Sequence, residues 1–438
     1  MNKRLQPTGF GSKSAMFLTA LINSAIARNG AFLAVVLIAL PGVSGPLPQE
    51  SPTFHQEFET LFHASLDFYS QLQRTTNGLY RDAFVLDQSK PPSRICSTAA
   101  TGVGLMALCM DYELGRNPAA PQEALQTLRA INGKTAGFSI GREKAGYFKH
   151  FFSSEDGSGK SPYSTVDTAI MVVGTLYCRN TFNDPQIKVE ADQLWNSIDW
   201  SLALAQPNGE QLYMQMEDGR PRESSRTFLF NEYYLLAWLI KESQIQKTGH
   251  SDVISFRELN TWTNQGLKLL CSNGHWPQCS FLVQFPFYMC HPCATDPLYR
   301  EFVLAQARAD QRECSQRVGV AEFWGCGAGG TPSHGYRANN YRNNPDNIVS
   351  PHIIAGFMPV FPLAQEHLLK LYRDHKRRVQ TPVGDLLPRF SVDRPDWHAG
   401  RIEAIDFSSM LFGLAGIHPQ LGMKFFDEKT QFTFNQKN

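Results

Sequence analysis

Apolar positions recur at helical spacing through most of the chain from Phe54 onward, and alternating strand patterns are scarce. Four predicted helices are apolar on nearly all sides, which is typical of buried helices; they cover 96–114, 163–179, 226–244 and 404–416. Four others carry a polar face, over 121–132, 186–204, 254–271 and 362–375. Further helices are predicted over 54–74, 298–313 and 351–357, and short extended pieces over 137–140, 147–152 and 211–214.

The two kinds of helix indicate an all-α fold in which an outer amphipathic layer surrounds buried helices. An (α/α)6 barrel (toroid) with short β pieces and long loops satisfies this pattern, and a large irregular helical bundle is the alternative. In such a barrel the inner helices run roughly parallel, so their N-termini share one end. No Pro/Ser-rich linker divides the chain after its first residues, and we expect a single domain over 50–438.

Three of the apolar helices have an acid in or just before their first turn: Asp167, Glu232 and Asp406. A carboxylate in a buried position is costly unless it is hydrogen-bonded, paired or used in chemistry. If the three helix starts lie at one end of a barrel, the acids face one cavity. Paired carboxylates are the groups that cleave glycosidic bonds.

Glu232 is the strongest candidate for a general acid. The aromatic residues around it would remove water and raise the pKa of its carboxyl group; they are Phe228, Phe230, Tyr233 and Tyr234. The following helix start favours the anion and lowers this pKa, but we expect desolvation to dominate. The alternative is a structural Glu232 that is neutralised by Arg226.

Asp167 and Asp406 have structural alternatives. Asp167 lies three residues after Ser164 and can form part of a capping box. Asp406 can serve as an ordinary N-cap. Glu403 and Asp167 both compete with Asp406 for the role of general base.

A long irregular segment from Glu322 to Arg342 combines aromatic rings with amide and guanidinium donors, as sugar-binding loops do. Together with Asp167 and Tyr233 it supplies the predicted substrate-binding residues, which in this segment are Trp324, His334, Tyr336, Arg337 and Tyr341. Its glycine-rich part, Gly325–Gly330, lacks the Lys-Ser/Thr of a phosphate loop. A structured surface loop is the alternative.

Composition narrows the function further. The chain has 41 basic and 40 acidic residues, so nothing favours nucleic-acid binding. Lysines and an arginine precede apolar runs at 15–27 and 31–40, which predicts a signal peptide or N-terminal anchor over 1–45. We therefore expect a periplasmic or secreted protein without a stable membrane span after processing.

Nine cysteines suit an exported chain, and their odd number leaves at least one thiol unpaired within the chain. Five lie between 271 and 314, which predicts a Cys-rich insertion held by local disulfides. A zinc site of Cys271, Cys279, Cys290 and Cys293 is an alternative with irregular spacing, and Cys290–Cys293 also has the spacing of a redox pair. No cofactor and no metal are expected at the catalytic residues.

Several segments, in order over about residues 60–417, together resemble the bacterial glycoamylase-like domain around glycoside hydrolase family 144. They are 97–105, 146–151, 164–169, 230–236, Trp324-Gly325, Tyr336 and 347–351. The resemblance implies an (α/α)6 barrel and an inverting endo-β-1,2-glucanase, with Glu232 as acid, Asp406 as base and Asp167 lining the sugar subsites. The chain departs from the family where Asp406-Phe407-Ser408-Ser409 replaces Asp-Gln-Gly-Pro, and where Tyr163 replaces a common acid.

The sequence thus predicts a glycoside hydrolase acting on a β-linked glucan. Three other functions stay open: a retaining transglycosylase or cyclase, a non-catalytic glucan-binding protein and a polysaccharide lyase.

Overall fold

The computed structural model describes residues 55–205, 210–253, 255–272 and 276–435. Residues 54–438 form one compact unit. The predicted signal peptide or anchor over 1–45 lies outside the described residues. Within the described part, no helix has the length and apolar character needed to cross a membrane.

Six helices make a closed ring of contacts at the centre of this unit. Each helix contacts the next in chain order, and the last contacts the first. The ring consists of α2 (Thr98–Glu113), α4 (Thr165–Thr181), α6 (Tyr234–Thr248), α7 (Phe281–Met289), α10 (Pro351–Gly356) and α12 (Ala404–Ile417). Most side chains of these helices are buried, which agrees with the apolar patterns of α2, α4 and α12.

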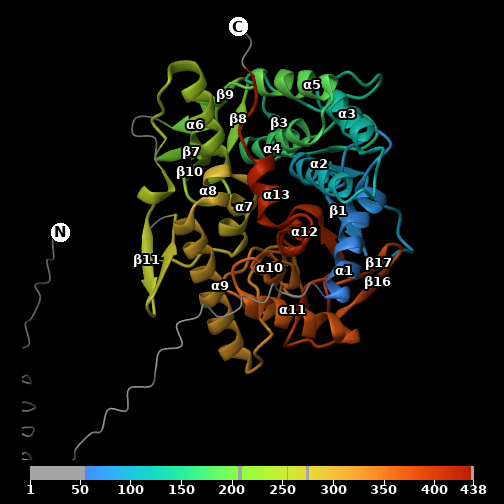
Figure 1. The fold of residues 1–438 in the computed structure, drawn as a ribbon, viewed down its shortest axis with the longest axis vertical. Helices are drawn as coiled ribbons and strands as arrows, with labels where there is room; N and C mark the ends of the chain where they lie inside the picture. The colour runs from blue at the N-terminus through green and yellow to red at the C-terminus, as the bar shows by residue number, and fades with distance from the viewer. Residues whose placement is uncertain (1–54, 206–209, 254, 273–275, 436–438) are drawn as a thin grey trace, which may run out of the picture. The chain divides into compact units, whose positions relative to one another are not determined.

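A second set of helices packs outside the ring. It consists of α1 (Gln56–Asp67), α3 (Ala120–Ile131), α5 (Pro185–Asn196), α9 (Pro297–Val318) and α11 (Pro362–Arg373). Helix α1 contacts α12 and α2, α3 contacts α2, α5 contacts α4, α9 contacts α7, and α11 contacts α10. Figure 1 shows α12 near the middle and these five helices at the edges. The short helices α8 (His291–Thr295) and α13 (Gly422–Lys429) fill the spaces between.

Glycines explain the two closest helix pairs in the ring. A Cβ atom at Gly102 would collide with the Ile170 carbonyl, and one at Gly174 would collide with the Gly102 carbonyl. Helices α2 and α4 therefore pack backbone against backbone. Gly413 serves the same purpose between α12 and α10, because its Cβ position is taken by the Ala355 carbonyl.

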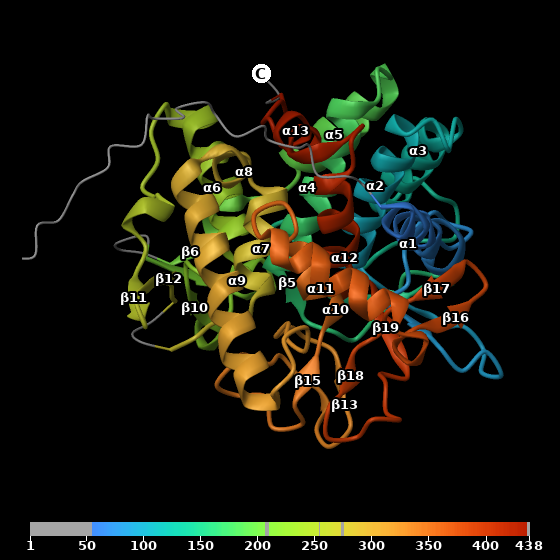
Figure 2. The same cartoon turned by 60° about the horizontal axis from the view of Figure 1, so that its bottom comes forward.

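Strands are short and connect the helices. All of the pairs are antiparallel, and the strands are β1 (Ala83–Val85), β2 (Ile95–Ser97), β3 (Phe148–Lys149), β4 (Phe151–Ser153), β5 (Tyr163–Ser164), β6 (Leu204–Ala205), β7 (Gln211–Tyr213), β8 (Gln215–Glu217), β9 (Arg220–Pro221), β10 (Arg226–Phe228), β11 (Thr261–Asn264), β12 (Leu267–Leu270), β13 (Gly330–Thr331), β14 (Gly335–Tyr336), β15 (Ile348–Val349), β16 (Val379–Thr381), β17 (Gly384–Leu386), β18 (Phe390–Ser391) and β19 (Arg401–Glu403). Pair β1–β19 sets Ala83 opposite Glu403 and so joins the two ends of the compact unit. Figure 2 shows β13, β15 and β18 at one end of the molecule and α13 at the other.

Four sequence predictions were wrong. The predicted helix 226–244 begins only at Tyr234, since its first residues form β10. The predicted helix 254–271 is a hairpin of β11 and β12, and the piece 137–140 forms no strand. The Cys-rich segment 271–314 is no insertion, because it contains α7 of the ring and most of α9.

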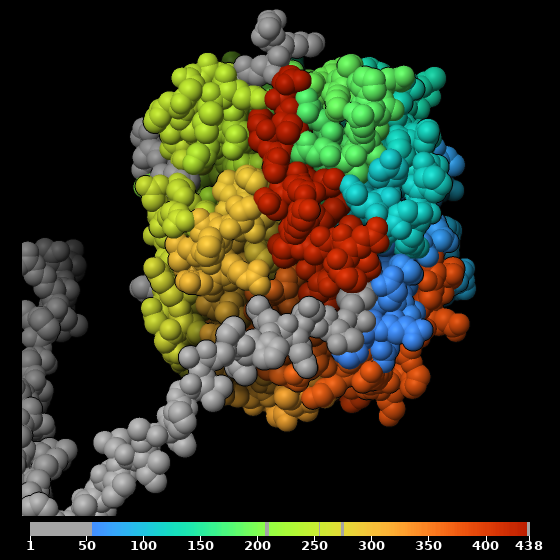
Figure 3. All heavy atoms as spheres, viewed as in Figure 1, coloured from blue at the N-terminus to red at the C-terminus, as the bar shows by residue number. Residues whose placement is uncertain are grey.

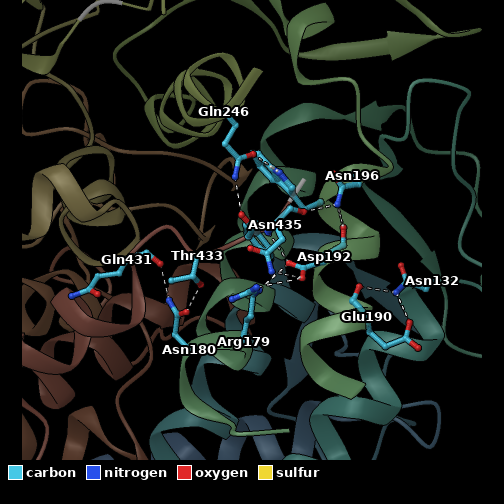
Figure 4. Close-up of polar contacts among 12 residues, drawn as sticks. Asn132, Arg179, Asn180, Glu190, Asp192, Asn196, Gln246, Gln431, Thr433 and Asn435 are labelled. Carbon is cyan, nitrogen blue, oxygen red and sulfur yellow. Dashed lines mark hydrogen bonds and ion pairs between the residues drawn. The ribbon is translucent and has the colours of Figure 1, made fainter. Parts of the chain in front are cut away.

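The C-terminal segment after α13 crosses the far ends of the ring helices. Figure 3 shows it in red between the α6 region and the α4–α5 region. Asn180, in the last turn of α4, donates to the carbonyls of Lys429 (3.0 Å) and Gln431 (2.8 Å), and Gln246 of α6 donates to Phe434 O (2.7 Å). Figure 4 shows this network with Asp192 at its centre, where Arg179 Nε (2.9 Å) and the Asn435 N–H (3.0 Å) meet its carboxylate.

Candidate active site

A cavity of about 680 Å³ opens where the ring helices begin. Residues at or near the starts of α2, α4, α6, α7 and α12 line it, so the N-terminal ends of these helices do share one end of the ring. Its lining includes Asp82, Ser97, His150, Asp167, Gln215, Glu232, Tyr233, Phe281, Phe285, Tyr336, Arg401, Glu403 and Asp406. The three acids Asp167, Glu232 and Asp406, far apart in sequence, thus face one space.

Glu232 occupies the turn just before α6. Asn231 shapes this turn, because its Oδ1 accepts the Tyr233 N–H at 2.8 Å and its amide donates to Thr227 Oγ1 at 2.7 Å. No hydrogen bond or ion pair to a described residue occupies the Glu232 carboxyl group, and the suggested partner Arg226 pairs with Glu223 instead. The structural alternative that relied on Arg226 is therefore wrong.

Burial is the main reason why the pKa of Glu232 rises to about 7, and the charge of Asp167 adds to the rise while His150 opposes it. Phe230 and Tyr233 are buried beside Glu232 as expected, whereas Phe228 is 37% exposed. Near neutral pH a large fraction of Glu232 therefore carries a proton that it can donate, which is the requirement for a general acid.

Asp406 lies in the first turn of α12 and is buried. The Tyr336 hydroxyl donates to its Oδ2 at 3.0 Å. Burial and the neighbouring Glu403 raise the pKa of Asp406 to about 8, while Arg389 and the Tyr336 hydrogen bond lower it. The predicted N-cap position belongs to Glu403, so the capping alternative for Asp406 is wrong.

Arg389 is a buried cation behind Asp406. Its guanidinium donates to Ser350 Oγ (3.0 Å) and to the carbonyls of Gly327 and Gly330 (both 3.2 Å). These neutral acceptors fix its position, and its charge still acts on the pKa of Asp406. Glu403, by contrast, has a direct partner, because Arg401 Nε lies 2.9 Å from its Oε1.

Asp167 pairs with a histidine that also lines the cavity. His150 Nδ1 lies 2.5 Å from Asp167 Oδ2. Burial lowers the pKa of His150, but the hydrogen bond and charge of Asp167, together with the charges of Asp82 and Glu232, raise it by more. The Ser164 hydroxyl accepts the Asp167 N–H at 3.3 Å, which is one half of the predicted capping box. Asp167 is thus both a helix-start residue and a cavity residue.

Of the predicted substrate-binding residues, Asp167, Tyr233 and Tyr336 line the cavity and the other four do not. Trp324 is fully buried and donates to His367 Nδ1 at 2.9 Å, and Tyr341 is buried beside Asn264. His334 pairs with Asp346, and Arg337 donates to Asn343. The loop packs back against the helices, so its indole is a core residue and not a sugar platform.

Among the residues in or near the cavity that had no role in the sequence analysis are Asp82, His150, Arg389 and Arg401. The Asp82 carbonyl accepts the Ala404 N–H at 2.8 Å, which holds Asp82 beside the start of α12. Burial raises the pKa of Asp82 to about 6, although His150 and Arg401 oppose the rise. Only His150 had a sequence signal, since it lies in the segment 146–151.

Among the described residues, Asp310, Cys314 and Cys326 form the one group of three or more His, Cys, Asp or Glu side chains close enough to share a metal ion, and this group lies outside the cavity.

No family model and no curated protein matches the sequence. Solved structures are similar in fold. An endo-β-1,2-glucanase from Chitinophaga pinensis, in complex with sophorotriose and glucose, superposes with a TM-score of 0.71 at 19% identity, covering 84% of this chain and 94% of that one. A protein of Bacteroides caccae with the provisional name of glucoamylase gives 0.71 at 18% identity (86% and 99% covered). An endo-β-1,2-glucanase from Talaromyces funiculosus, in complex with sophorose, gives 0.61 at 12% identity (85% of both). The chain therefore has the fold of these proteins over most of its length.

Proposed function

We propose that the protein is an exported glycoside hydrolase that cleaves β-1,2-glucan within the chain and inverts the anomeric centre. One observation carries this proposal: the starts of α4, α6 and α12 bring Asp167, Glu232 and Asp406 to one cavity, where Glu232 has no ion-pair partner among the described residues. Two of the structures with the same fold are named endo-β-1,2-glucanases and hold β-1,2-linked sugars, which supports this substrate.

The ring of six helices and its outer layer support an (α/α)6 barrel as the fold type. The cyclic contacts from α2 through α12 and the common end for the helix starts are what this barrel requires. The cavity with the three acids then lies at the end of the barrel where the ring helices begin.

Glu232 acts as the general acid in this proposal. It donates its proton to the glycosidic oxygen as the bond to the anomeric carbon breaks. Its raised pKa supplies the protonated form near neutral pH, and Tyr233 beside it lines the subsite for the departing sugar.

Asp406 acts as the general base. It accepts a proton from the water that attacks the anomeric carbon from the opposite face, so the product has the inverted configuration. We favour Asp406 over Glu403, because Arg401 pairs directly with Glu403, and over Asp167, because His150 pairs with Asp167. Arg389 and Tyr336 support the anion of Asp406, since both lower its pKa.

Sugar rings would stack on the rings that line the cavity. Tyr336 is 53% exposed while its hydroxyl stays bonded to Asp406, so one face of its ring is free to contact a substrate. Asp167 with His150, and Gln215, offer hydrogen-bond partners for hydroxyl groups.

Export is supported by the basic and apolar pattern of residues 1–45. N-terminal sequencing of the protein recovered from the periplasm or the medium tests it, and an N-terminus at Met1 contradicts cleavage.

The function is tested by incubating the purified protein with linear glucans of defined linkage. We expect β-1,2-glucan alone to be shortened, with several oligosaccharides early in the reaction, and NMR to show the α-anomer first. A β-anomer product indicates a retaining transglycosylase. Binding measured by calorimetry without new reducing ends indicates a glucan-binding protein, and either outcome overturns the proposal.

A further inference from the structure

Two buried thiols meet at the base of the loop that closes one side of the cavity. Cys314 lies near the end of α9, and Cys326 follows it after the turn at Gly319. Their Sγ atoms are 3.2 Å apart, and the two side chains are 3% and 1% exposed. This is closer than an ordinary van der Waals contact between sulfur atoms.

The backbone around Cys326 is fixed in this position by Asp310. Asp310 Oδ2 accepts the Cys326 N–H at 2.8 Å and the Ser280 hydroxyl at 2.6 Å. Asp310 is fully buried on α9, so it joins α9 to the start of α7 and to the loop. The approach of the two sulfurs thus results from a built contact and not from two free side chains.

A zinc ion suits this group poorly. Two thiolates bound to one tetrahedral zinc at 2.3 Å lie about 3.8 Å apart, and a closed structural site needs four ligands. Here the sulfurs are closer, and the group has three candidate ligands. The Arg317 guanidinium, 3.5 Å from Cys314 Sγ, also disfavours a second cation.

We propose that Cys314 and Cys326 are the site of a disulfide bond in the oxidised protein. A thiolate of one cysteine attacks a disulfide oxidant, such as oxidised glutathione or the disulfide of a thiol oxidoreductase, and releases one thiol. The second cysteine then displaces the other thiol from the mixed disulfide. In sum, the two cysteines lose two protons and two electrons, and the oxidant becomes two thiols.

Such a bond would secure one wall of the cavity. The segment that follows Cys326 contributes Ala328, Tyr336 and Ala338 to the lining, and Tyr336 bonds Asp406. A covalent link at Cys326 ties the root of this segment to α9. The inference does not depend on the proposed activity, because it concerns the link alone.

Peptide mapping tests the proposal directly. The full-length protein is refolded with a mixture of reduced and oxidised glutathione, denatured without reductant, alkylated with iodoacetamide and digested. We expect the peptides of Cys314 and Cys326 to appear as one linked species, lighter than the two thiol peptides by two hydrogen atoms. The proposal is overturned if both cysteines carry the alkyl group, if either is linked to another cysteine, or if stoichiometric zinc is lost in Cys314→Ser.

A stability measurement provides a second readout. Reductant should lower the Tm of the wild-type protein by about 3 to 5 °C, since the bond closes a short loop in the unfolded chain. The Tm of Cys314→Ser should not respond to reductant, whereas the control Cys271→Ser, a buried thiol elsewhere in the same region, should respond as the wild type does. If peptide mapping finds the disulfide but reductant leaves the wild-type Tm unchanged, the inference that the disulfide stabilises the cavity wall is overturned.

Discussion

Helix α4 extends from the cavity to the C-terminal segment, and its two ends differ in the charged groups that surround them. In its first turn, Asp167 faces a cavity shared with Glu232 and Asp406. In its last turn, about 18 Å away, Arg179 is paired with Asp192 at 2.9 Å, and Asn180 bonds the chain after α13. Acids gather at one end, whereas Arg179 and Asn180 at the other end have direct partners.

The difference between the two ends of α4 indicates that residues at the cavity serve chemistry and residues at the far end serve stability. Buried groups of like charge that share one cavity destabilise the folded state, and natural proteins keep them where they serve function. At the far end, the bonds of Asn180 and Gln246 to the C-terminal segment connect parts of the chain that are distant in sequence, and they are lost when the chain unfolds. Substitutions at the cavity should therefore change activity with little loss of stability, and substitutions at the far end should do the reverse.

The largest effect is expected for Glu232→Gln. The amide cannot donate a proton to the leaving oxygen, so kcat should fall by about 10³-fold on β-1,2-glucan. Because the substitution removes a buried carboxyl group, Tm should stay constant or rise. The matched control is Glu223→Gln, an exposed glutamate nearby on the same segment, which should keep wild-type turnover. A Glu232→Gln enzyme with more than a tenth of the normal rate would contradict the assignment.

Asp406→Asn should follow, with a loss of about 10²-fold in kcat, since general-base assistance to the water is removed. Glu403→Gln is the comparison, because Glu403 lines the same cavity and begins the same helix. It should lose less activity than Asp406→Asn. The opposite ranking in steady-state kinetics would assign the base to Glu403.

A smaller effect, of about tenfold, is expected for Tyr336→Phe, and it should depend on pH. In the proposed mechanism, activity needs Glu232 protonated and Asp406 ionised. Because the pKa of Glu232 (about 7) lies below that of Asp406 (about 8), only a minor fraction of the protein has this combination; the fraction rises with pH up to about 7 and falls above about 8. The wild-type profile of kcat/KM should therefore be a narrow bell with its maximum between these values.

Loss of the Tyr336 hydroxyl removes a bond that lowers the pKa of Asp406. In Tyr336→Phe the alkaline side of the bell should therefore extend to higher pH and its maximum should be lower. A pH–rate profile measured for both enzymes checks this. A uniform loss of rate without a change of shape would mean that the hydroxyl acts only in substrate binding.

At the far end, Asp192→Asn should lower stability by about 1–3 kcal/mol, because it weakens the bonds to Arg179 and Asn435. Chemical denaturation measures the loss, and kcat should match that of the wild type. The neighbour Asp184→Asn is the control; its side chain caps α5 and Asn keeps that role, so stability should change little. A large fall in kcat for Asp192→Asn would break the separation between the two ends.

Much of the site was predictable because its signals are local. Asp167, Glu232 and Asp406 stand out as acids at the starts of apolar helices, and the helix starts share one end in any ring of parallel helices. Asp82 carries no such signal, and His150 has only its place in the segment 146–151. The pairing of β1 with β19 and the hydrogen bond to Asp167 bring these two residues to the cavity.

The errors in the fold also have physical causes. Residues 261–270 have enough apolar positions for a helix, but Gln265 and Gly266 adopt positive φ angles of 46° and 82° and form a tight hairpin turn. Helix α7 was missed because Pro286 lies inside it and cysteines surround it. Trp324 resembled a sugar platform because a sequence does not reveal whether an aromatic loop residue turns outward or into the core.

Gly102 and Gly174 have a further consequence for anyone who wishes to alter the substrate range. Helices α2 and α4 touch through these two residues, and Ser97 and Asp167 at their starts belong to the cavity wall. A methyl group added at Gly102 or Gly174 would push the backbones of α2 and α4 apart. The width of the cavity therefore depends on the absence of a side chain at these two positions. Substitutions meant to change the substrate range should leave the contact between α2 and α4 intact and alter the segments that carry Tyr336 and Gln215, which also line the cavity.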